Sequence, residues 1–456
     1  MTNVASGMSG TNGSGTVPVI ATGNGLLRGA AEGAVAAFRG IPYAASPVGA
    51  LRFAAPVPHP AWSGVRDALR PGPAVPQGPS RLEAVMGERV PDWDEEGCLT
   101  LNVWTPNQAL TAPADAAAPR PVLLWFHGGG FSSGSGGWDW YDGARLAELG
   151  DMVVVTANYR LGPLGYLYLP ELGVDNPGCR DQGAVLRWVR ENITAFGGDP
   201  ESITVGGQSA GAFSALALAL DPATAGSVRR VIAQSGPWGL PLQDPATADA
   251  AADSYLRLLG VERSRHGLAE LRALPVQRLL EAYRLLAAEL GTPGDPTPPM
   301  YPVLGGAGVP QPLLPAVAAG GLGDKELLLG TVTDEMTAFG HRGPGSEAAA
   351  HRFFGVGGAE LAERRAAQGT PAHVYRFARR PSVDDLGLGA THCAELPFLF
   401  GTFDAYPAAP MLGAVGASDR ALASDFGGAL AAFTATGAPG GDWAPYRTGA
   451  DVASFG

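Results

Sequence analysis

The residues with the clearest chemical potential form the short string VGGQSAG, at positions 205–211. Its Gly-x-Ser-x-Gly pattern places Ser209 between Gly207 and Gly211. A serine in such a turn can act as the nucleophile of acyl transfer, provided that a base, an acid and oxyanion donors lie elsewhere in the chain. The pattern alone is a modest signal, because a chain of 456 residues with 66 glycines produces such strings by chance.

The sequence on either side of Ser209 strengthens this interpretation. The apolar run ITVGG precedes the serine, and the helical pattern AGAFSALALAL follows it closely. In a strand–turn–helix of this kind the tight turn lifts the serine hydroxyl above the sheet, at the positive end of a helix. We therefore interpret Ser209 as a nucleophile rather than as part of a plain glycine turn.

A nucleophile of this type needs N–H donors for the oxyanion that develops on the substrate. The string WFHGGGF, at positions 125–131, directly follows the apolar run VLLWF. Three consecutive glycines allow the backbone to turn its N–H groups toward a substrate oxygen without a Cβ atom in the way. This segment is predicted to be the oxyanion loop.

The base and the acid should follow the serine, since this arrangement orders its triad as serine, acid, histidine. The acidic pair Asp334-Glu335 follows the strand-like run ELLLGT, and the residues alone do not choose between the two acids. A carboxylate is needed here to hold the tautomer of the imidazole. Among the later histidines we favour His392, which lies in GATHCAELPFLFG between small residues and an apolar run.

The elements that must position these residues are predicted from apolar runs at 122–126, 152–157, 203–207, 228–236 and 326–331. Continuous Val/Leu/Ile runs are typical of parallel strands covered on both faces. Helical spacing between the second and third runs completes a strand–helix–strand unit, which indicates a doubly wound α/β sheet. A further strand is expected at 372–378 and a late helix at 419–437.

The domain organisation is predicted to be a single catalytic domain over residues 1–456. Helical insertions are expected at about 245–290 and 341–370, where Ala, Leu, Glu and Arg recur at helical spacing. Residues 1–23 have neither a basic nor an apolar signal region, and we interpret them as a flexible polar arm that leads into a first strand.

The composition describes a globular chain with a sizeable core, with 46% hydrophobic and 16% charged residues. A net charge of −12 argues against nucleic acid as a partner. No apolar run is long enough to span a membrane. The three cysteines, Cys98, Cys179 and Cys393, are too few and too scattered for a disulfide framework or a zinc site, so we expect buried free thiols and a cytoplasmic location.

The chain resembles the type B carboxylesterases, the cholinesterase-like branch of the α/β-hydrolases that also contains bacterial p-nitrobenzyl esterase-like enzymes. The resemblance implies an α/β-hydrolase fold with a helical cap, and ester hydrolysis without a cofactor or metal. It begins near residue 20, continues to the end of the chain, and rests on the ordered motifs FRGIPYAASPVGALRF, EEGCLTLNVWTP, WFHGGGF, NYRLGPLGYL, DQGAVLRWVRENITAFGGDPESITVGGQSAG, AQSG, GTVTDEMTAF and GATHCAELPFLFG.

The resemblance also implies roles for particular residues. It makes Ser209 the nucleophile and His392 the general base, and it selects Glu335 over Asp334 as the acid. The implied oxyanion donors are the backbone N–H groups of Gly129, Gly130 and Ala210. Two ion pairs that brace the loops around the site are implied as well: Arg52 with Glu96, and Arg160 with Asp181.

The chain departs from the family pattern in ways that bear on its substrate. Met336 stands where the family usually has glycine after the acid, and the acid-to-histidine separation is shorter than usual. Together with the ending at WAPYRTGADVASFG, this suggests a shortened cap and a wider, more open pocket that favours bulky or aromatic esters. Aromatic candidates for the pocket wall are Phe131, Trp138, Trp238 and Phe339.

Two alternatives to ester hydrolysis stay open. A carbamate or amide hydrolase could use the same triad, because the triad does not itself select the leaving group. A non-catalytic binding module is the rival of another class, but the chain has the full set of residues that such modules typically lose. The expected partner is a small-molecule ester, with no nucleic acid or membrane, and the chain is expected to be a monomer or a weak homo-oligomer.

Overall fold

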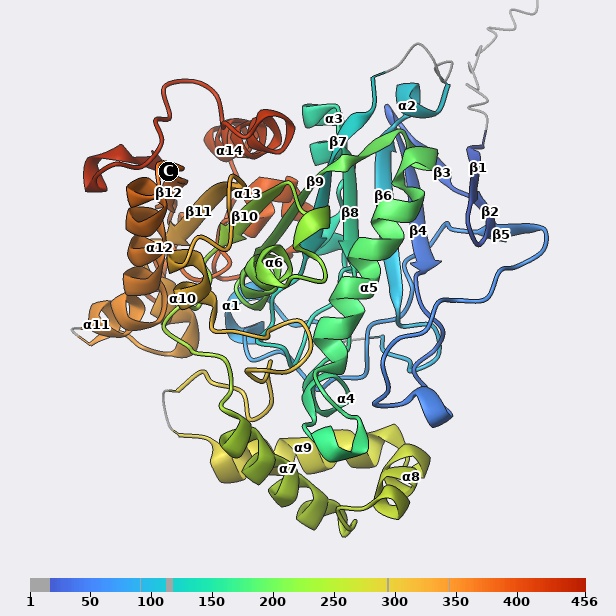
Figure 1. Cartoon of the computed structure of the whole chain (residues 1–456). Helices are drawn as coiled ribbons and strands as arrows, with labels where there is room; N and C mark the ends of the chain where they lie inside the picture. The colour runs from blue at the N-terminus through green and yellow to red at the C-terminus, as the bar shows by residue number, and fades with distance from the viewer. Residues whose placement is uncertain (1–16, 91, 112–117, 293–294, 344) are drawn as a thin grey trace, which may run out of the picture.

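The computed structural model describes residues 17–90, 92–111, 118–292, 295–343 and 345–456. Most of the predicted polar arm, residues 1–16, lies outside the described residues. The first described strand, β1 (Val19–Thr22), forms a small sheet with β2 (Gly25–Arg28) and β5 (Val65–Asp67) at one side of the molecule (Figure 1).

A ten-stranded sheet forms the centre of the protein, in the order β13-β12-β11-β10-β9-β7-β8-β6-β4-β3. Neighbours from β13 to β8 pair in parallel, whereas β8-β6, β6-β4 and β4-β3 pair antiparallel. This confirms the predicted mostly parallel α/β-hydrolase sheet. The strands are β3 (Ala30–Glu32), β4 (Val35–Pro42), β6 (Thr100–Pro106), β7 (Arg120–Phe126), β8 (Val153–Ala157), β9 (Gly198–Gln208), β10 (Arg230–Gln234), β11 (Glu326–Val332), β12 (His373–Phe377) and β13 (Val452–Phe455).

Both faces of the sheet are covered, which explains why its strands read as continuous apolar runs. In β7, Val122, Leu124 and Phe126 belong to one core cluster, whereas Leu123 and Trp125 belong to the other. The first cluster packs against α5 (Pro177–Asn192) and α6 (Ala210–Leu220), which cross in front of the sheet in Figure 1. The second packs against α3 (Ala144–Gly150), α13 (Leu396–Phe400) and α14 (Ala417–Thr436).

Helices occupy both segments where insertions are expected. In the first, α7 (Pro245–Leu259), α8 (Arg265–Ala273) and α9 (Val276–Leu290) form a separate layer below the sheet in Figure 1. Local sequence explains the limits of α7: the Asp244 carboxylate accepts from the N–H groups of Ala246 and Thr247, and the helix ends at left-handed Gly260. In the second segment, α11 (Ser346–Ala350), a π-helical turn (His351–Gly355) and α12 (Val356–Ala367) run on from one another.

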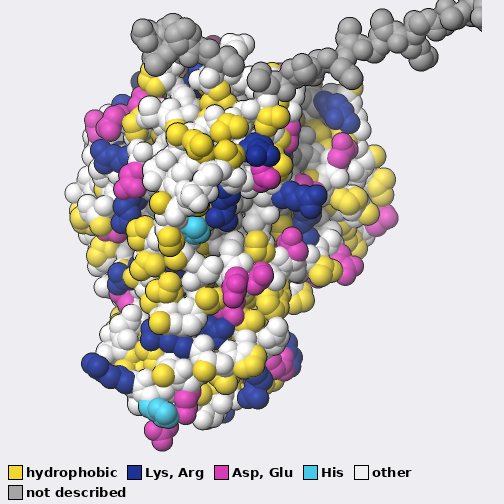
Figure 2. Space-filling model, turned by 90° about the vertical axis from the view of Figure 1, so that its right-hand side faces the viewer, with side chains coloured by type: hydrophobic (Ala, Val, Ile, Leu, Met, Phe, Trp, Pro, Cys, Tyr) yellow, Lys and Arg dark blue, Asp and Glu magenta, His cyan; other side chains and the backbone are white. Residues whose placement is uncertain are grey.

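The remaining short helices lie in connections that border the site or the sheet. They are α1 (Glu83–Met86), α2 (Asn107–Thr111), α4 (Gly162–Tyr166) and α10 (Leu313–Ala318). Within the described ranges, we find no helix with the length and apolar character that a bilayer crossing requires. Figure 2 shows acidic and basic side chains intermingled over one face of the molecule.

Of the two expected ion pairs, one is confirmed and one has a different partner. Arg160 and Asp181 form a buried pair, with Nη2 and Oδ1 2.7 Å apart. Arg52 pairs with Glu95 through two contacts, and the prediction of Glu96 was wrong. The N–H group of Glu96 donates to Asp94 Oδ1 in a tight turn, and this turn leaves the Glu96 side chain exposed while directing Glu95 to the arginine.

Candidate active site

The backbone at Ser209 forms the sharp turn that the motif predicts. Strand β9 ends at Gln208, α6 begins at Ala210, and Ser209 between them has φ 57° and ψ −121°. A positive φ is costly for a residue with a side chain, and such strain is typical of functional turns. The neighbouring glycine is needed because a Cβ at Gly211 would lie 2.0 Å from the carbonyl oxygen of Phe126.

The predicted acid and base are in contact. His392 Nδ1 lies 2.5 Å from Glu335 Oε2, and both side chains are buried. The other carboxylate oxygen, Oε1, accepts a hydrogen bond from the N–H group of Val332 at 3.0 Å. A buried carboxylate that accepts from Nδ1–H leaves the lone pair of His392 on Nε2, the tautomer that a general base requires.

Asp334 has a different task from its neighbour. Its N–H group donates to the carbonyl oxygen of Ala390, and its Oδ2 accepts from the Ala390 N–H group at 2.9 Å. A bond between the hydroxyls of Thr337 and Thr391 joins the same two loops at 2.7 Å. Asp334 therefore holds the histidine loop against the end of β11, while Glu335 contacts the histidine itself.

The Nε2 atom of His392 faces the turn that carries the serine. It lies 3.2 Å from the side-chain amide nitrogen of Gln208, the residue before Ser209. Among the described residues no hydrogen bond joins Ser209 Oγ to the imidazole, a contact that is often loose in structures without substrate. Sequence reasoning assigned no role to Gln208, although its place inside the motif puts it beside the histidine.

The glycine loop after β7 contains one position, Gly129, that only glycine tolerates. Gly129 and Gly130 have φ values of 112° and 59°, and a Cβ at Gly129 would lie 2.0 Å from the carbonyl oxygen of Ser133. Gly129, Gly130 and Ala210 line one pocket together with Ser209. Ala210 is the first residue of α6, so its N–H group has no acceptor within the helix. The three N–H groups predicted to bind the oxyanion thus come from two elements that meet beside the serine.

His127 contacts this loop and supports it. The sequence did not indicate a role for this residue. Its Nδ1 lies 2.8 Å from the Gly128 carbonyl oxygen, and its ring stacks on Tyr159 with centroids 4.5 Å apart. Burial lowers the pKa of His127 to about 4, so the ring is neutral at ordinary pH. A neutral ring can donate from Nδ1 to the carbonyl and brace the glycine loop without adding charge.

Two of the four expected wall residues line the pocket beside Ser209. These are Phe131 and Phe339. The structure does not bring Trp138 and Trp238 into this lining: Trp138 packs edge-on against Trp140, and Trp238 stacks on Phe213. The wall is instead completed by residues that the sequence did not single out, chiefly Leu240, Phe353, Phe354, Pro237, Pro296 and Pro298.

The pocket beside the serine holds about 50 Å³ and adjoins a second cavity of about 800 Å³. Arg81 and Pro298 line both spaces. A small space at the nucleophile next to a larger one can accept an ester whose reacting carbonyl is held tightly and whose remainder extends away from it.

A second acid, Glu395, is buried close to the triad. Both of its carboxylate oxygens are shielded from solvent, and the hydroxyl of Ser235 is their neighbour. Burial, and to a smaller extent the charge of Glu335, raises the pKa of Glu395 to about 8. Glu395 therefore carries a proton at neutral pH, which spares the site a second negative charge behind the histidine.

We predict that the Glu395→Gln variant loses less stability than the wild type as the pH rises. Folded Glu395 keeps its proton up to about pH 8, whereas the unfolded chain releases it near 4.5. Protonated Glu395 therefore makes its full contribution to the free energy of unfolding below pH 4.5. This contribution decreases as the pH rises from 4.5 to about 8, by up to ~1.4 kcal/mol per pH unit. Urea unfolding of both proteins between about pH 5 and pH 8 measures this difference. If the free energies of unfolding of the two proteins changed equally with pH, the raised pKa of Glu395 would be refuted.

Comparison with known proteins agrees with this geometry. The family model described as "Carboxylesterase family" matches residues 16–353. Phenmedipham hydrolase of Pseudarthrobacter oxydans is 34% identical over 440 residues, covering 87% of this chain and 85% of that protein. Para-nitrobenzyl esterase of Bacillus subtilis is 35% identical over 429 residues, covering 85% of this chain and 84% of that protein.

A solved structure gives the same result for the fold. The Geobacillus stearothermophilus carboxylesterase superposes with a TM-score of 0.80 at 33% identity, covering 96% of each chain. The sequence motifs, the sheet topology and the relatives that match over most of both chains thus indicate the same family. The chain belongs to the carboxylesterase family, as a type B carboxylesterase that hydrolyses carboxylic esters.

Proposed function

We propose that Ser209, His392 and Glu335 carry out this hydrolysis through an acyl-enzyme. Ser209 Oγ attacks the ester carbonyl carbon and its proton passes to His392 Nε2. Glu335 holds the imidazole and stabilises its protonated form. The observation that supports this most strongly is the buried Glu335–His392 hydrogen bond opposite the strained turn at Ser209.

The oxyanion of the tetrahedral intermediate accepts hydrogen bonds from the N–H groups of Gly129, Gly130 and Ala210. Its collapse breaks the bond to the alcohol oxygen, which takes the proton from His392 Nε2 as it leaves. A water then attacks the acyl carbon and gives a proton to the same nitrogen. The second collapse returns that proton to Ser209 Oγ and releases the carboxylic acid.

We further propose that the enzyme prefers bulky or aromatic esters. Aromatic rings line the pocket beside Ser209. The ring centroids of Phe339 and Phe354 lie 5.3 and 5.0 Å from the centroid of the His392 ring. It adjoins a cavity of about 800 Å³, which can hold the rest of a large substrate. Rings give a large contact area to a flat aromatic group at little entropic cost.

A matched set of esters and amides tests the size preference and the preference for esters over amides. For acetate and benzoate esters of one alcohol, benzyl alcohol, we expect kcat/KM for the benzoate to equal or exceed that for the acetate. The corresponding benzyl amides should react far more slowly. A steep fall from acetate to benzoate would contradict the size preference, and amide cleavage as fast as ester cleavage would contradict the ester preference.

The location of the protein is proposed from its thiols. Cys98, Cys179 and Cys393 are free and buried. Free thiols are typical of proteins kept in a reducing compartment, so we propose the cytoplasm. Recovery of the native protein in a periplasmic or secreted fraction would contradict this.

A further inference from the structure

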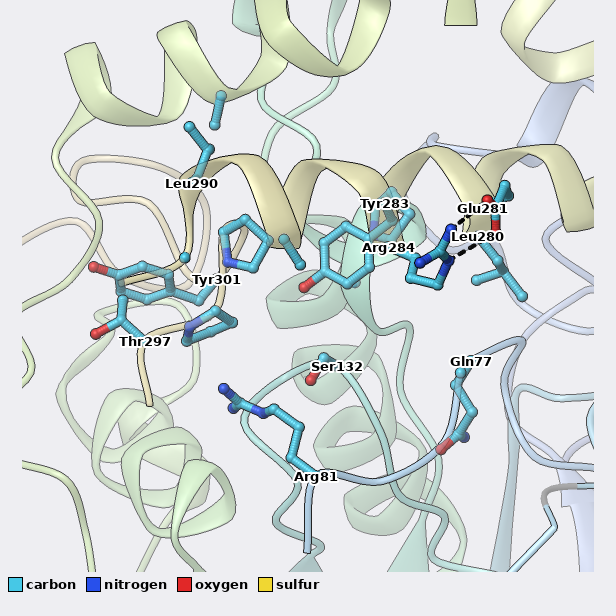
Figure 3. A pocket seen from close by; sticks show the side chains of 18 of the residues that line it. Gln77, Arg81, Ser132, Leu280, Glu281, Tyr283, Arg284, Leu290, Thr297 and Tyr301 are labelled. Carbon is cyan, nitrogen blue, oxygen red and sulfur yellow. Dashed lines mark hydrogen bonds and ion pairs between the residues drawn. The ribbon is translucent and has the colours of Figure 1, made fainter. Parts of the chain in front are cut away.

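The larger cavity lies between helix α9 and the segment 76–81, directly beside the serine pocket. Figure 3 shows Arg81 rising from this segment into the space, with Tyr283 reaching toward it from α9 and Ser132 between them. Apolar surface makes up most of the cavity wall, and the polar side chains set in it indicate what the cavity can bind.

Arg81 is a cation without a carboxylate partner within ion-pair distance in the part of the chain that the structure describes. Its Nη1 donates to the Pro296 carbonyl oxygen at 2.6 Å. The other arginine of this cavity, Arg284, is matched by Glu281 at 2.7 Å. Arg81 is exposed and lines the cavity. The protein around the guanidinium lowers its pKa, but the group stays protonated.

Asp295 does not neutralise Arg81 by direct contact. The charge of Asp295 acts on the guanidinium from a distance, but Asp295 Oδ1 accepts from the N–H group of Thr297 at 2.9 Å. Apart from the bond to the Pro296 carbonyl oxygen, the N–H donors of Arg81 have no hydrogen-bond acceptor among the described residues. Its donors are therefore available to a ligand.

Tyr283 supplies a second group of the same kind. Its hydroxyl is buried and has no hydrogen-bond partner among the described residues. In Figure 3 this hydroxyl points into the cavity, on the side from which Arg81 approaches. A hydroxyl donor and a guanidinium that face one space form a pair of donors suited to the two oxygens of a carboxylate.

The position of Arg81 links this pair to the reacting centre. A Cβ built on Gly130 would lie 2.4 Å from Arg81 Nη2, so the guanidinium lies over the same glycine that is predicted to bind the oxyanion. An anion held by Arg81 therefore lies a short distance from the ester carbonyl. A benzene ring that carries the two groups at para positions is a spacer of this kind.

We propose that Arg81 and the Tyr283 hydroxyl bind a carboxylate carried by the substrate, so that the enzyme selects esters with an anionic group close to the scissile bond. This inference rests on the proposed ester hydrolysis and adds a substrate class to it. The carboxylate belongs either to the acyl part, as in a half-ester of an aromatic dicarboxylic acid, or to the alcohol part.

Two matched pairs of substrates distinguish these sources. The acyl pair is benzyl 4-carboxybenzoate and its neutral analogue benzyl 4-carbamoylbenzoate. The alcohol pair is 4-carboxybenzyl benzoate and 4-carbamoylbenzyl benzoate. In the wild-type enzyme we expect kcat/KM for the carboxylate member of one pair to exceed that for its amide by roughly 100-fold, since each charged hydrogen bond contributes substantially.

The variants Arg81→Gln and Tyr283→Phe then assign the preference to its residues. Arg81→Gln should lower kcat/KM for the carboxylate ester far more than for its amide, so that the ratio of the two values falls close to one. Tyr283→Phe should reduce the preference by roughly tenfold, and Arg81→Lys should keep part of it because the charge remains.

The outcomes separate this inference from the proposed function. If wild type hydrolyses the neutral esters without preferring either carboxylate, the anion site is refuted and ester hydrolysis stands. If Arg81→Gln slows charged and neutral esters equally, Arg81 acts on the oxyanion of every ester and the inference is also refuted. If wild type hydrolyses none of the four esters, the proposed function itself fails.

Discussion

Replacing Ser209 with alanine is expected to lower kcat by about 10⁵-fold, with little change in KM. The variant removes the atom that attacks the ester, but it leaves the N–H donors and the pocket intact. Some hydrolysis above the water rate should remain, since those donors still stabilise the oxyanion. Activity close to that of the wild type would refute the assignment of the nucleophile.

The measurement combines steady-state kinetics with active-site titration by an organophosphate. The wild type should be labelled once per chain at Ser209, and Ser209→Ala should not be labelled. Ser214→Ala is the matched control, because Ser214 lies one turn further along α6 and its Oγ donates to the Ala210 carbonyl oxygen. This control should stay within about tenfold of the wild type. Stoichiometric labelling of a serine other than Ser209 would contradict the proposal.

The second large effect is expected at Glu335. Glu335→Gln should lower kcat by about 10³- to 10⁴-fold, because an amide neither stabilises the imidazolium nor holds the right tautomer of His392. The loss should appear in kcat more than in KM, since Glu335 does not line the pocket beside Ser209. Thermal unfolding checks that the variant is folded.

The adjacent acid provides the control for this prediction. Asp334→Asn keeps an oxygen that can accept from the Ala390 N–H group, and it leaves the contact between Glu335 and His392 in place. We expect kcat of Asp334→Asn to fall by less than about tenfold, with a modest loss of thermal stability. A larger loss of kcat in Asp334→Asn than in Glu335→Gln would reverse the assignment of the acid.

The strands and the major helices could be predicted because their causes are local. Continuous apolar runs predicted β7, β8 and β10, and burial on both faces of the sheet explains those runs. The limits of α7 follow from a capping carboxylate at Asp244 and a glycine at position 260. Such signals act within a few residues, so they are readable without the rest of the fold.

The pocket wall could not be predicted in the same way. An aromatic residue gives the same sequence signal whether it packs in the core, as Trp238 does against Phe213, or lines a cavity, as Phe339 does. Phe353 and Phe354 reach the pocket only because the helical segment 346–367 folds back beside it. Which ring faces the substrate depends on how distant segments meet.

By itself, the sequence determined the turn at Ser209, the glycine loop after β7 and the order of serine, acid and histidine. These depend on backbone conformations that neighbouring glycines make possible and on the chain order of the strands. The residues alone did not choose between the two adjacent acids; the family resemblance selected Glu335, and the tertiary structure shows its contact with His392. Only the tertiary structure decided that Arg52 meets Glu95 and that Arg81 has no carboxylate partner in the described part of its cavity. Glu335 and Asp334 are adjacent in the chain but point in different directions, as do Glu95 and Glu96. Packing between loops far apart in the chain sets these directions.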